Sequence, residues 1–143
     1  MRFVLDASVT LTWLLRDAND RDAAYAFAVL KRLREVDADV AVPVIWSLEI
    51  ANVIARAEAK DQVTPAQSAA FLEMLRVAAI TVDTTTETHA LTDTLQLARR
   101  YRLSAYDASY LELALRCGAP LATVDAELLR AATKAGVKRL PAK

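Results

Sequence analysis

Histidine and cysteine are almost absent from this chain of 143 residues, which contains one of each, His89 and Cys117. A single histidine excludes a histidine pair for acid–base cleavage of RNA, and it excludes a zinc site built from several histidines. With only one cysteine, the usual structural zinc cages are excluded as well. Cys117 cannot form an internal disulfide, so we expect a protein of the reducing cytoplasm.

The chain also has few glycines, no long apolar run and no net charge. The two glycines, Gly118 and Gly136, cannot build a Walker loop or a GxGxxG turn. No apolar run approaches the roughly 20 residues of a membrane span, and the N-terminus reaches Asp6 too early for a signal peptide. The formal net charge is zero, so any nucleic-acid site must be local or completed by metal ions. If the protein acts on phosphates, a metal ion bound by carboxylates is then the most plausible remaining means.

Short apolar runs alternate with helical patterns along the whole chain. The length and the 55% hydrophobic content fit one domain over residues 1–143. We expect strands at 2–6, 40–42, 80–83 and from Pro120, with an edge strand at 137–140. Helices are expected at 9–15 (capped by Ser8), 20–36, 44–60, after the capping box 64–67, at 84–101 (opened by a capping box at 84–87), 104–117 and 126–134. This pattern predicts a three-layer α/β/α domain with a mostly parallel sheet of four or five strands.

Four acidic residues, far apart in sequence, interrupt or end these apolar elements. Asp6 and Asp125 each follow an expected strand, whereas Glu49 and Asp107 lie in apolar helices. An unpaired charge is costly in such places, so each acid is either neutralised locally or shares a cation with the others. Because sites in parallel sheets form beyond the carboxyl ends of the strands, Asp6 and Asp125 are well placed to meet.

Local structural roles are the alternative for three of these acids. Asp107 lies three residues after Ser104 and could complete a capping box, and Asp125 could cap the helix that follows it. Asp6 could be a turn residue. Glu49 differs, because no lysine or arginine lies three or four residues away on its helix. A local salt bridge is therefore not expected for Glu49.

Oxygen ligands without histidine or thiolate select Mg²⁺ or Mn²⁺. A water made acidic by such a metal can attack a phosphodiester, and the metal also neutralises charge on the phosphate oxygens. Polar neighbours could orient the ligands and the water, and the candidates are Ser8, Asn52 and Thr123. We therefore predict that the catalytic and metal-binding residues are Asp6, Glu49, Asp107 and Asp125.

Four segments together resemble the signature of the PIN-domain family. They are Asp6-Ala7-Ser8-Val9, the stretch from Pro43 to Asn52, Leu103 to Ala108, and Leu121 to Asp125. The compact length resembles the VapC toxins of bacterial toxin–antitoxin pairs. The resemblance implies a Mg²⁺/Mn²⁺-dependent endoribonuclease that is often dimeric, acts on RNA and is blocked by a cognate VapB-like antitoxin encoded beside it. The family's four acids map onto Asp6, Glu49, Asp107 and Asp125, and its Ser/Thr positions onto Ser8 and Thr123.

Several alternatives stay open or are disfavoured by particular positions. A haloacid-dehalogenase phosphatase would have a second aspartate where Ser8 stands, and a response-regulator receiver would have a lysine within 120–124. A PIN nuclease of RNA processing without an antitoxin, and an inactive interaction module, remain alternatives. The basic run Arg99, Arg100 and Arg102 either contacts RNA phosphates or suits a helix end. Trp13 and Trp46 are expected in the core, with a partner groove as the alternative for Trp13.

Overall fold

Four short parallel strands form the sheet of the computed structural model, which describes residues 1–15 and 17–141. They are β1 (Arg2–Leu5), β2 (Asp39–Val42), β3 (Ile80–Val82) and β4 (Leu121–Ala122), and they lie in the order β3-β2-β1-β4. Val4 of β1 pairs with Ala41 on one side and with Leu121 on the other. The carboxyl ends of β1 and β4 therefore meet side by side.

The predicted edge strand at 137–140 is wrong. Only an isolated parallel bridge joins Arg139 to Leu121, supported by the backbone hydrogen bonds around it. Pro141 follows at once and has no N–H to donate, so the segment cannot continue a ladder. The sheet thus has the lower of the two expected strand numbers.

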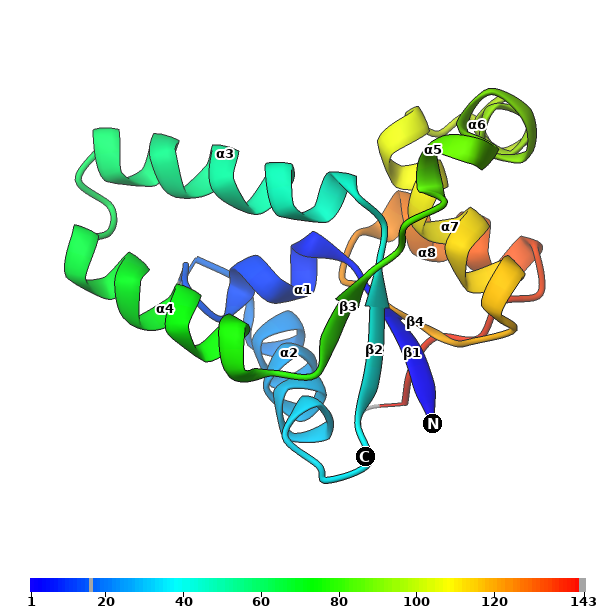
Figure 1. Cartoon of the computed structure of the whole chain (residues 1–143). Helices are drawn as coiled ribbons and strands as arrows, with labels where there is room; N and C mark the ends of the chain where they lie inside the picture. Colours follow the sequence, from blue (N-terminus) through cyan, green and yellow to red (C-terminus); the bar gives the residue numbers. More distant parts are fainter. Residues whose placement is uncertain (16, 142–143) are drawn as a thin grey trace.

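Helices cover the sheet on two sides, as predicted for a three-layer domain (Figure 1). One group consists of α1 (Ala7–Thr12), α2 (Asp20–Leu33), α3 (Ile45–Ala59) and α4 (Pro65–Val77). The other group consists of α5 (Thr86–His89), α6 (Leu95–Tyr101), α7 (Ala105–Cys117) and α8 (Ala126–Lys134). Among the described residues, no helix has the length and apolar character needed to cross a bilayer.

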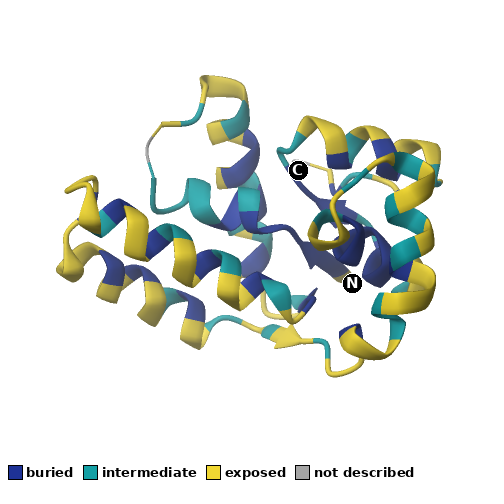
Figure 2. Ribbon diagram, turned by 90° about the horizontal axis from the view of Figure 1, so that it is seen from above, coloured by how far each residue is buried: buried dark blue, intermediate teal, exposed yellow. Residues whose placement is uncertain are grey.

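The core lies where α7 and the central strands meet, and Figure 2 shows this buried centre between exposed outer helix faces. Val4 and Leu5 of β1 are completely buried, and every residue of α7 from Ala108 to Ala114 is buried. Helix α7 contacts β1, β4, α5, α6 and α8. A residue on α7 is therefore held by packing from several directions, which makes this helix a rigid support.

Two predicted helix starts are wrong, and both involve hydroxyl side chains. Asp6, rather than Ser8, occupies the N-cap position of α1, and the Ser8 hydroxyl binds Asp6 instead. Thr84 does not open a capping box, because α5 begins at Thr86, whose hydroxyl donates to Asp83. The expected helix over 84–101 is also interrupted by a π-turn, η1 (Ala90–Thr94).

Other helix ends follow the predicted capping chemistry. Thr64 and Gln67 form the reciprocal capping box of α4, and the Ser104 hydroxyl accepts a bond from the Asp107 N–H at the start of α7. Gly118 ends α7 in the left-handed conformation with φ of 60°, which glycine adopts without steric cost. The Ser104 cap fixes where α7 begins, and with it the position of Asp107.

Candidate active site

All four predicted acids line one pocket of about 270 Å³ beyond the carboxyl ends of β1 and β4. Each comes from a different place: Asp6 follows β1, Glu49 lies on α3, Asp107 lies in the first turn of α7 and Asp125 precedes α8. The predicted neighbours Ser8 and Asn52 line the same pocket. No lysine or arginine is among its described lining residues, so the pocket has a negative electrostatic character.

Asp6 is the most buried of the four acids, with 4% of its surface exposed. Its Oδ2 atom accepts one hydrogen bond from the Ser8 hydroxyl at 2.5 Å and another from the Thr123 hydroxyl at 2.8 Å. Burial raises the pKa of Asp6 to about 7, and the charges of Glu49 and Asp107 act in the same direction against the two hydroxyl donors. The metal-free pocket therefore resists full ionisation.

Thr123 does not line the pocket, but its buried hydroxyl binds two residues that do, Asp6 and Asp125. Its side chain is completely buried, and its Oγ1 atom accepts the Asp125 N–H at 3.0 Å while donating to Asp6. Its carbonyl oxygen accepts two bonds from Arg139, at 3.1 Å from Nε and 2.9 Å from Nη2. Arg139 also lies over the Tyr25 ring, 3.6 Å from its centroid. Sequence reasoning missed Arg139, because nothing near it in the chain identifies this distant carbonyl as its partner.

Glu49 finds its partner on another helix, in agreement with the absence of a local cation. The Tyr110 hydroxyl donates to Glu49 Oε1 at 2.5 Å, across 61 residues of sequence. Burial raises the pKa of Glu49, the Tyr110 hydrogen bond opposes this, and the charge of Asp107 adds to it. Sequence reasoning also missed Tyr110. The available signal was a tyrosine one helical turn after Asp107, on the same face of α7.

Asp107 and Asp125 both combine a helix-start position with a place in the pocket. Asp125 Oδ1 accepts the Leu128 N–H at 2.9 Å, so the expected N-cap role is present together with pocket exposure. At Asp107 it is the backbone N–H that binds Ser104, at 3.0 Å. The pKa of Asp107 is raised by burial first and by the charge of Asp125 second, while a hydrogen bond with Ser104 lowers it.

The donor chemistry of this pocket fits a hard divalent cation, although the acids do not all converge. Within residues 1–15 and 17–141, no three histidine, cysteine or acidic side chains are grouped so that they could hold one ion together. The four acids therefore share one pocket without forming a tight cluster. Mg²⁺ usually takes one or two carboxylates and keeps several waters, which matches oxygen donors spread around a small pocket.

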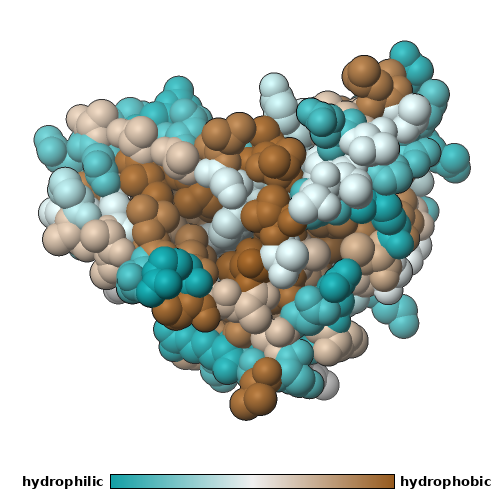
Figure 3. Space-filling model, in the orientation of Figure 1, coloured by the Kyte–Doolittle hydropathy of each residue, from teal (hydrophilic) through white to brown (hydrophobic). Residues whose placement is uncertain are grey.

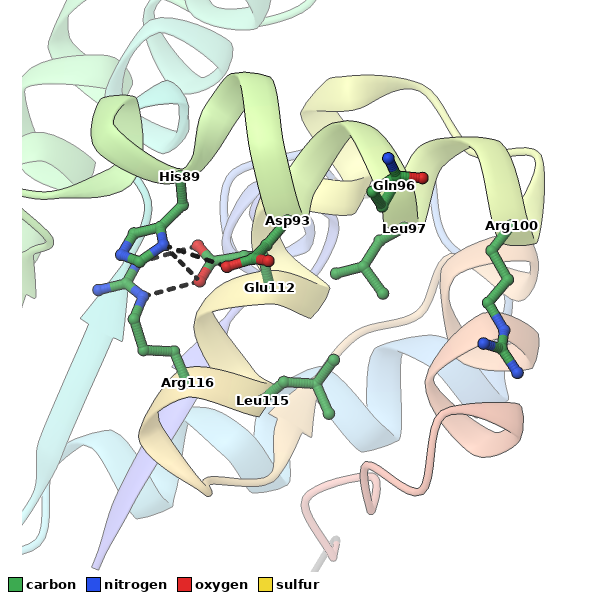
Figure 4. Close-up of a pocket in the computed structure, with 8 residues that line it drawn as sticks. All are labelled: His89, Asp93, Gln96, Leu97, Arg100, Glu112, Leu115 and Arg116. Carbon is green, nitrogen blue, oxygen red and sulfur yellow. Dashed lines mark hydrogen bonds and ion pairs between the residues drawn. The ribbon is translucent and has the colours of Figure 1, made fainter.

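A separate charged cluster joins α7 to the segment after β3, beside a pocket of about 500 Å³ between η1, α6 and α7 that Figure 4 shows. Arg116 directs its N–H groups at Glu112, Asp83 and Thr85 over 2.7–3.0 Å. This neutralises Glu112, which is 4% exposed, and it holds the pKa of Asp83 well below its usual range. None of the four predicted acids lines this pocket. We interpret the cluster as a structural ion network.

Other residues named from the sequence have simpler surroundings. Arg99 and Arg100 lie in the last turn of α6, where positive charge suits the helix dipole, and Arg102 follows as its left-handed C-cap. Trp46 is buried and donates to the Thr10 hydroxyl at 3.1 Å, as expected for a core residue. Trp13 is partly buried and lines a cavity of about 290 Å³ between α1 and α2.

An apolar groove of about 540 Å³ separates α3 from α4 and reaches β3. Figure 3 shows apolar side chains gathered between the two helices. Those lining the groove include Ile50, Ile54, Leu72, Leu75 and Ile80. Glu49 is absent from this lining and lies in the acid pocket instead. Helix α3 therefore contributes to two surfaces of different chemistry.

Comparison with known proteins identifies the family. The PIN domain family model matches residues 3–134. A structure of PAE2754 from Pyrobaculum aerophilum is similar with a TM-score of 0.65 and 22% identity, covering 92% of this chain and 79% of that one. FitAcB from Neisseria gonorrhoeae is similar with a TM-score of 0.62 and 18% identity, covering 98% and 97%. Curated protein sequences give no match. At these identities the solved structures show a shared fold, and the family match confirms the resemblance seen in the sequence: the chain belongs to the PIN-domain family.

Proposed function

We propose that this chain is a Mg²⁺- or Mn²⁺-dependent endoribonuclease that acts as the toxin of a toxin–antitoxin pair. The observation that carries the proposal is the single pocket lined by Asp6, Glu49, Asp107 and Asp125. Membership of the PIN-domain family, whose members are generally metal-dependent nucleases, supports the reaction class. The RNA substrate, the metal and the antitoxin are parts of the proposal.

One or two of the four acids would hold the cation directly and the others through its waters, using oxygens that the protein leaves free. In Asp6 both hydroxyl donors bind Oδ2, so Oδ1 has no hydrogen bond from the described residues. When bound, the cation would neutralise charge on the phosphate and make a water acidic enough to attack the phosphorus, and the bond from phosphorus to the leaving ribose oxygen would break. The acids would orient that water and the scissile phosphate, and the hydroxyls of Ser8 and Thr123 keep Asp6 fixed while Asn52 lines the pocket wall.

The proposed reaction is tested by replacing Asp107 with asparagine. The Ser104 hydroxyl binds the backbone N–H of residue 107, so this cap survives in Asp107→Asn and the fold should be kept. We expect near-complete loss of cleavage of a structured RNA in Mn²⁺ buffer. Asp37→Asn, which changes an exposed aspartate far from the pocket, is the matched control. Wild-type cleavage by Asp107→Asn would remove this residue from the catalytic set.

The toxin role is tested in cells. Expression of the chain in a bacterium should arrest growth, and the neighbouring small gene should relieve the arrest. An acid-lined pocket favours a basic side chain from the antitoxin at the place of the metal, near Asp6, Glu49 and Asp107. Arrest that persists in an Asp6→Asn, Asp107→Asn double variant would contradict the proposal. RNA cleavage in vitro without any arrest would favour a role in RNA processing.

We also expect a homodimer with one nuclease domain in each chain. The open apolar groove between α3 and α4 is compatible with association, because apolar patches of this kind often mark interfaces. Sedimentation equilibrium of the purified chain measures the association state directly, and a monomer at micromolar concentration would contradict this expectation.

A further inference from the structure

Tyr110 presents one polar atom of an otherwise apolar core to the acid pocket. The residue is completely buried in α7 and belongs to the main hydrophobic cluster. Its hydroxyl donates to Glu49 Oε1 at 2.5 Å, and Asp107 lies one helical turn earlier on the same helix. Because the ring is packed on all sides, the hydroxyl has little freedom to follow Glu49 if the carboxylate moves.

The direction of this hydrogen bond is fixed. A phenol has one proton, and here that proton is directed at Glu49. Because an ionised carboxylate has no proton to donate, Tyr110 is the donor in this pair.

Glu49 and Asp6 are anchored in the same way. Hydroxyl groups occupy one oxygen of each carboxylate: Tyr110 binds Oε1 of Glu49, while Ser8 and Thr123 bind Oδ2 of Asp6. The other oxygens, Oε2 and Oδ1, receive no hydrogen bond within the described part of the chain. Each acid is thus held at one oxygen and free at the other, which suits a ligand that offers a single oxygen to a cation.

We propose that Tyr110 is the positioning residue of Glu49. By occupying Oε1 it fixes the rotamer of Glu49, directs Oε2 toward the pocket and holds the carboxylate near Asp107 against their mutual repulsion. This inference rests on the proposed metal-dependent function. In a purely structural role, the Tyr110 hydroxyl would only form its own hydrogen bond, and removing it would leave the metal affinity unchanged. The positioning role predicts that the metal affinity falls.

The experiment compares Tyr110→Phe with Tyr101→Phe. Both variants remove only a hydroxyl from a tyrosine ring that packs in the fold, but Tyr101 lies on α6 and does not line the acid pocket. Mn²⁺ binding to the purified variants is measured by calorimetry. We expect Tyr110→Phe to weaken Mn²⁺ binding about 10- to 100-fold, as loss of outer-shell partners usually does, and Tyr101→Phe to bind like the wild type.

A second measurement repeats the Mn²⁺ titration in a Glu49→Gln background. In a Glu49→Gln background, removal of the Tyr110 hydroxyl should no longer have its full effect on Mn²⁺ binding, because the two residues act as a coupled pair.

The outcomes separate the two proposals. Wild-type Mn²⁺ affinity in Tyr110→Phe, or an equal loss in Tyr101→Phe, overturns the positioning role while the nuclease proposal stands. An undiminished effect of Tyr110→Phe in the Glu49→Gln background also overturns it. A wild-type chain that binds neither Mn²⁺ nor Mg²⁺ overturns the proposed function, and the positioning role falls with it.

Discussion

Asp6 should make the metal-free protein less stable as the pH rises, and Asp6→Asn should remove much of this dependence. The folded-state pKa is about 7, compared with 3.8 for an unperturbed aspartate. The folded protein therefore holds this proton more tightly than the unfolded chain does. Its contribution to stability is full below pH 3.8 and is lost as the pH rises through about 7.

The size of the effect follows from the shift. Each pKa unit corresponds to about 1.4 kcal/mol, so the full change is about 4 kcal/mol, of which about 2.5 kcal/mol falls between pH 5 and pH 8. In Asp6→Asn the amide oxygen can still accept the hydroxyl protons of Ser8 and Thr123, but it does not titrate. Glu49 and Asp107 also have raised pKa values, so a smaller slope should remain in the variant.

The assay is urea unfolding in EDTA at pH 5, 6.5 and 8. The wild type should lose stability across this range, and Asp6→Asn should be the more stable protein at pH 8. Mn²⁺ at 100 times its dissociation constant should add about 2.7 kcal/mol to the wild type at pH 8, and much less to the variant. The reasoning is refuted if Asp6→Asn keeps the wild-type slope, or if the wild type shows no slope at all. Asp37→Asn serves as the exposed control.

Two further predictions concern the support of the fold. Arg116→Met removes the guanidinium that binds the buried carboxylate of Glu112. It should lower the free energy of unfolding by about 3 kcal/mol in urea titrations. A loss below about 1 kcal/mol would show that water replaces the guanidinium. Asp125→Ala removes the N-cap of α8 and should cost about 1 kcal/mol, whereas Asp125→Asn keeps an acceptor and should be nearly neutral in stability. Equal stability of these two variants would contradict the capping role.

The sequence predicted those parts of the site that depend on local rules. Asp6 and Asp125 follow apolar strands, and parallel strands bring their carboxyl ends to one edge, so their meeting was predictable. The sequence correctly predicted that Glu49 has no local salt bridge, and its hydrogen-bond partner is the distant Tyr110. The identity of that partner was not predictable, because the packing that brings α7 to α3 is not encoded near either residue. Ser8 was expected both as a helix cap and as a neighbour of the acids, and only the second role is found, because a cap and a carboxylate anchor require the same kind of side chain.

The π-turn and the charged cluster are two further features that local sequence rules did not predict. The composition of residues 90–94 does not distinguish a π-helical turn from an ordinary α-helical one. One continuous helix was therefore expected over 84–101. Arg116 and Asp83 lie 33 residues apart and meet only because α7 passes beside the segment after β3. Periodicity predicts which face of a helix is buried, but it does not identify the partner of a charge.

The bonds from Arg139 to the Thr123 carbonyl have a consequence for the order of events during synthesis. The loop that presents Thr123 to Asp6 is secured by a residue near the opposite end of the chain. A ribosome adds about 5–20 residues per second, so on the order of ten seconds separate the translation of Asp6 from that of Arg139. On a nascent chain the Thr123 carbonyl therefore lacks its two bonds from Arg139 until Arg139 has left the exit tunnel, and a product that stops before Arg139 would never form them.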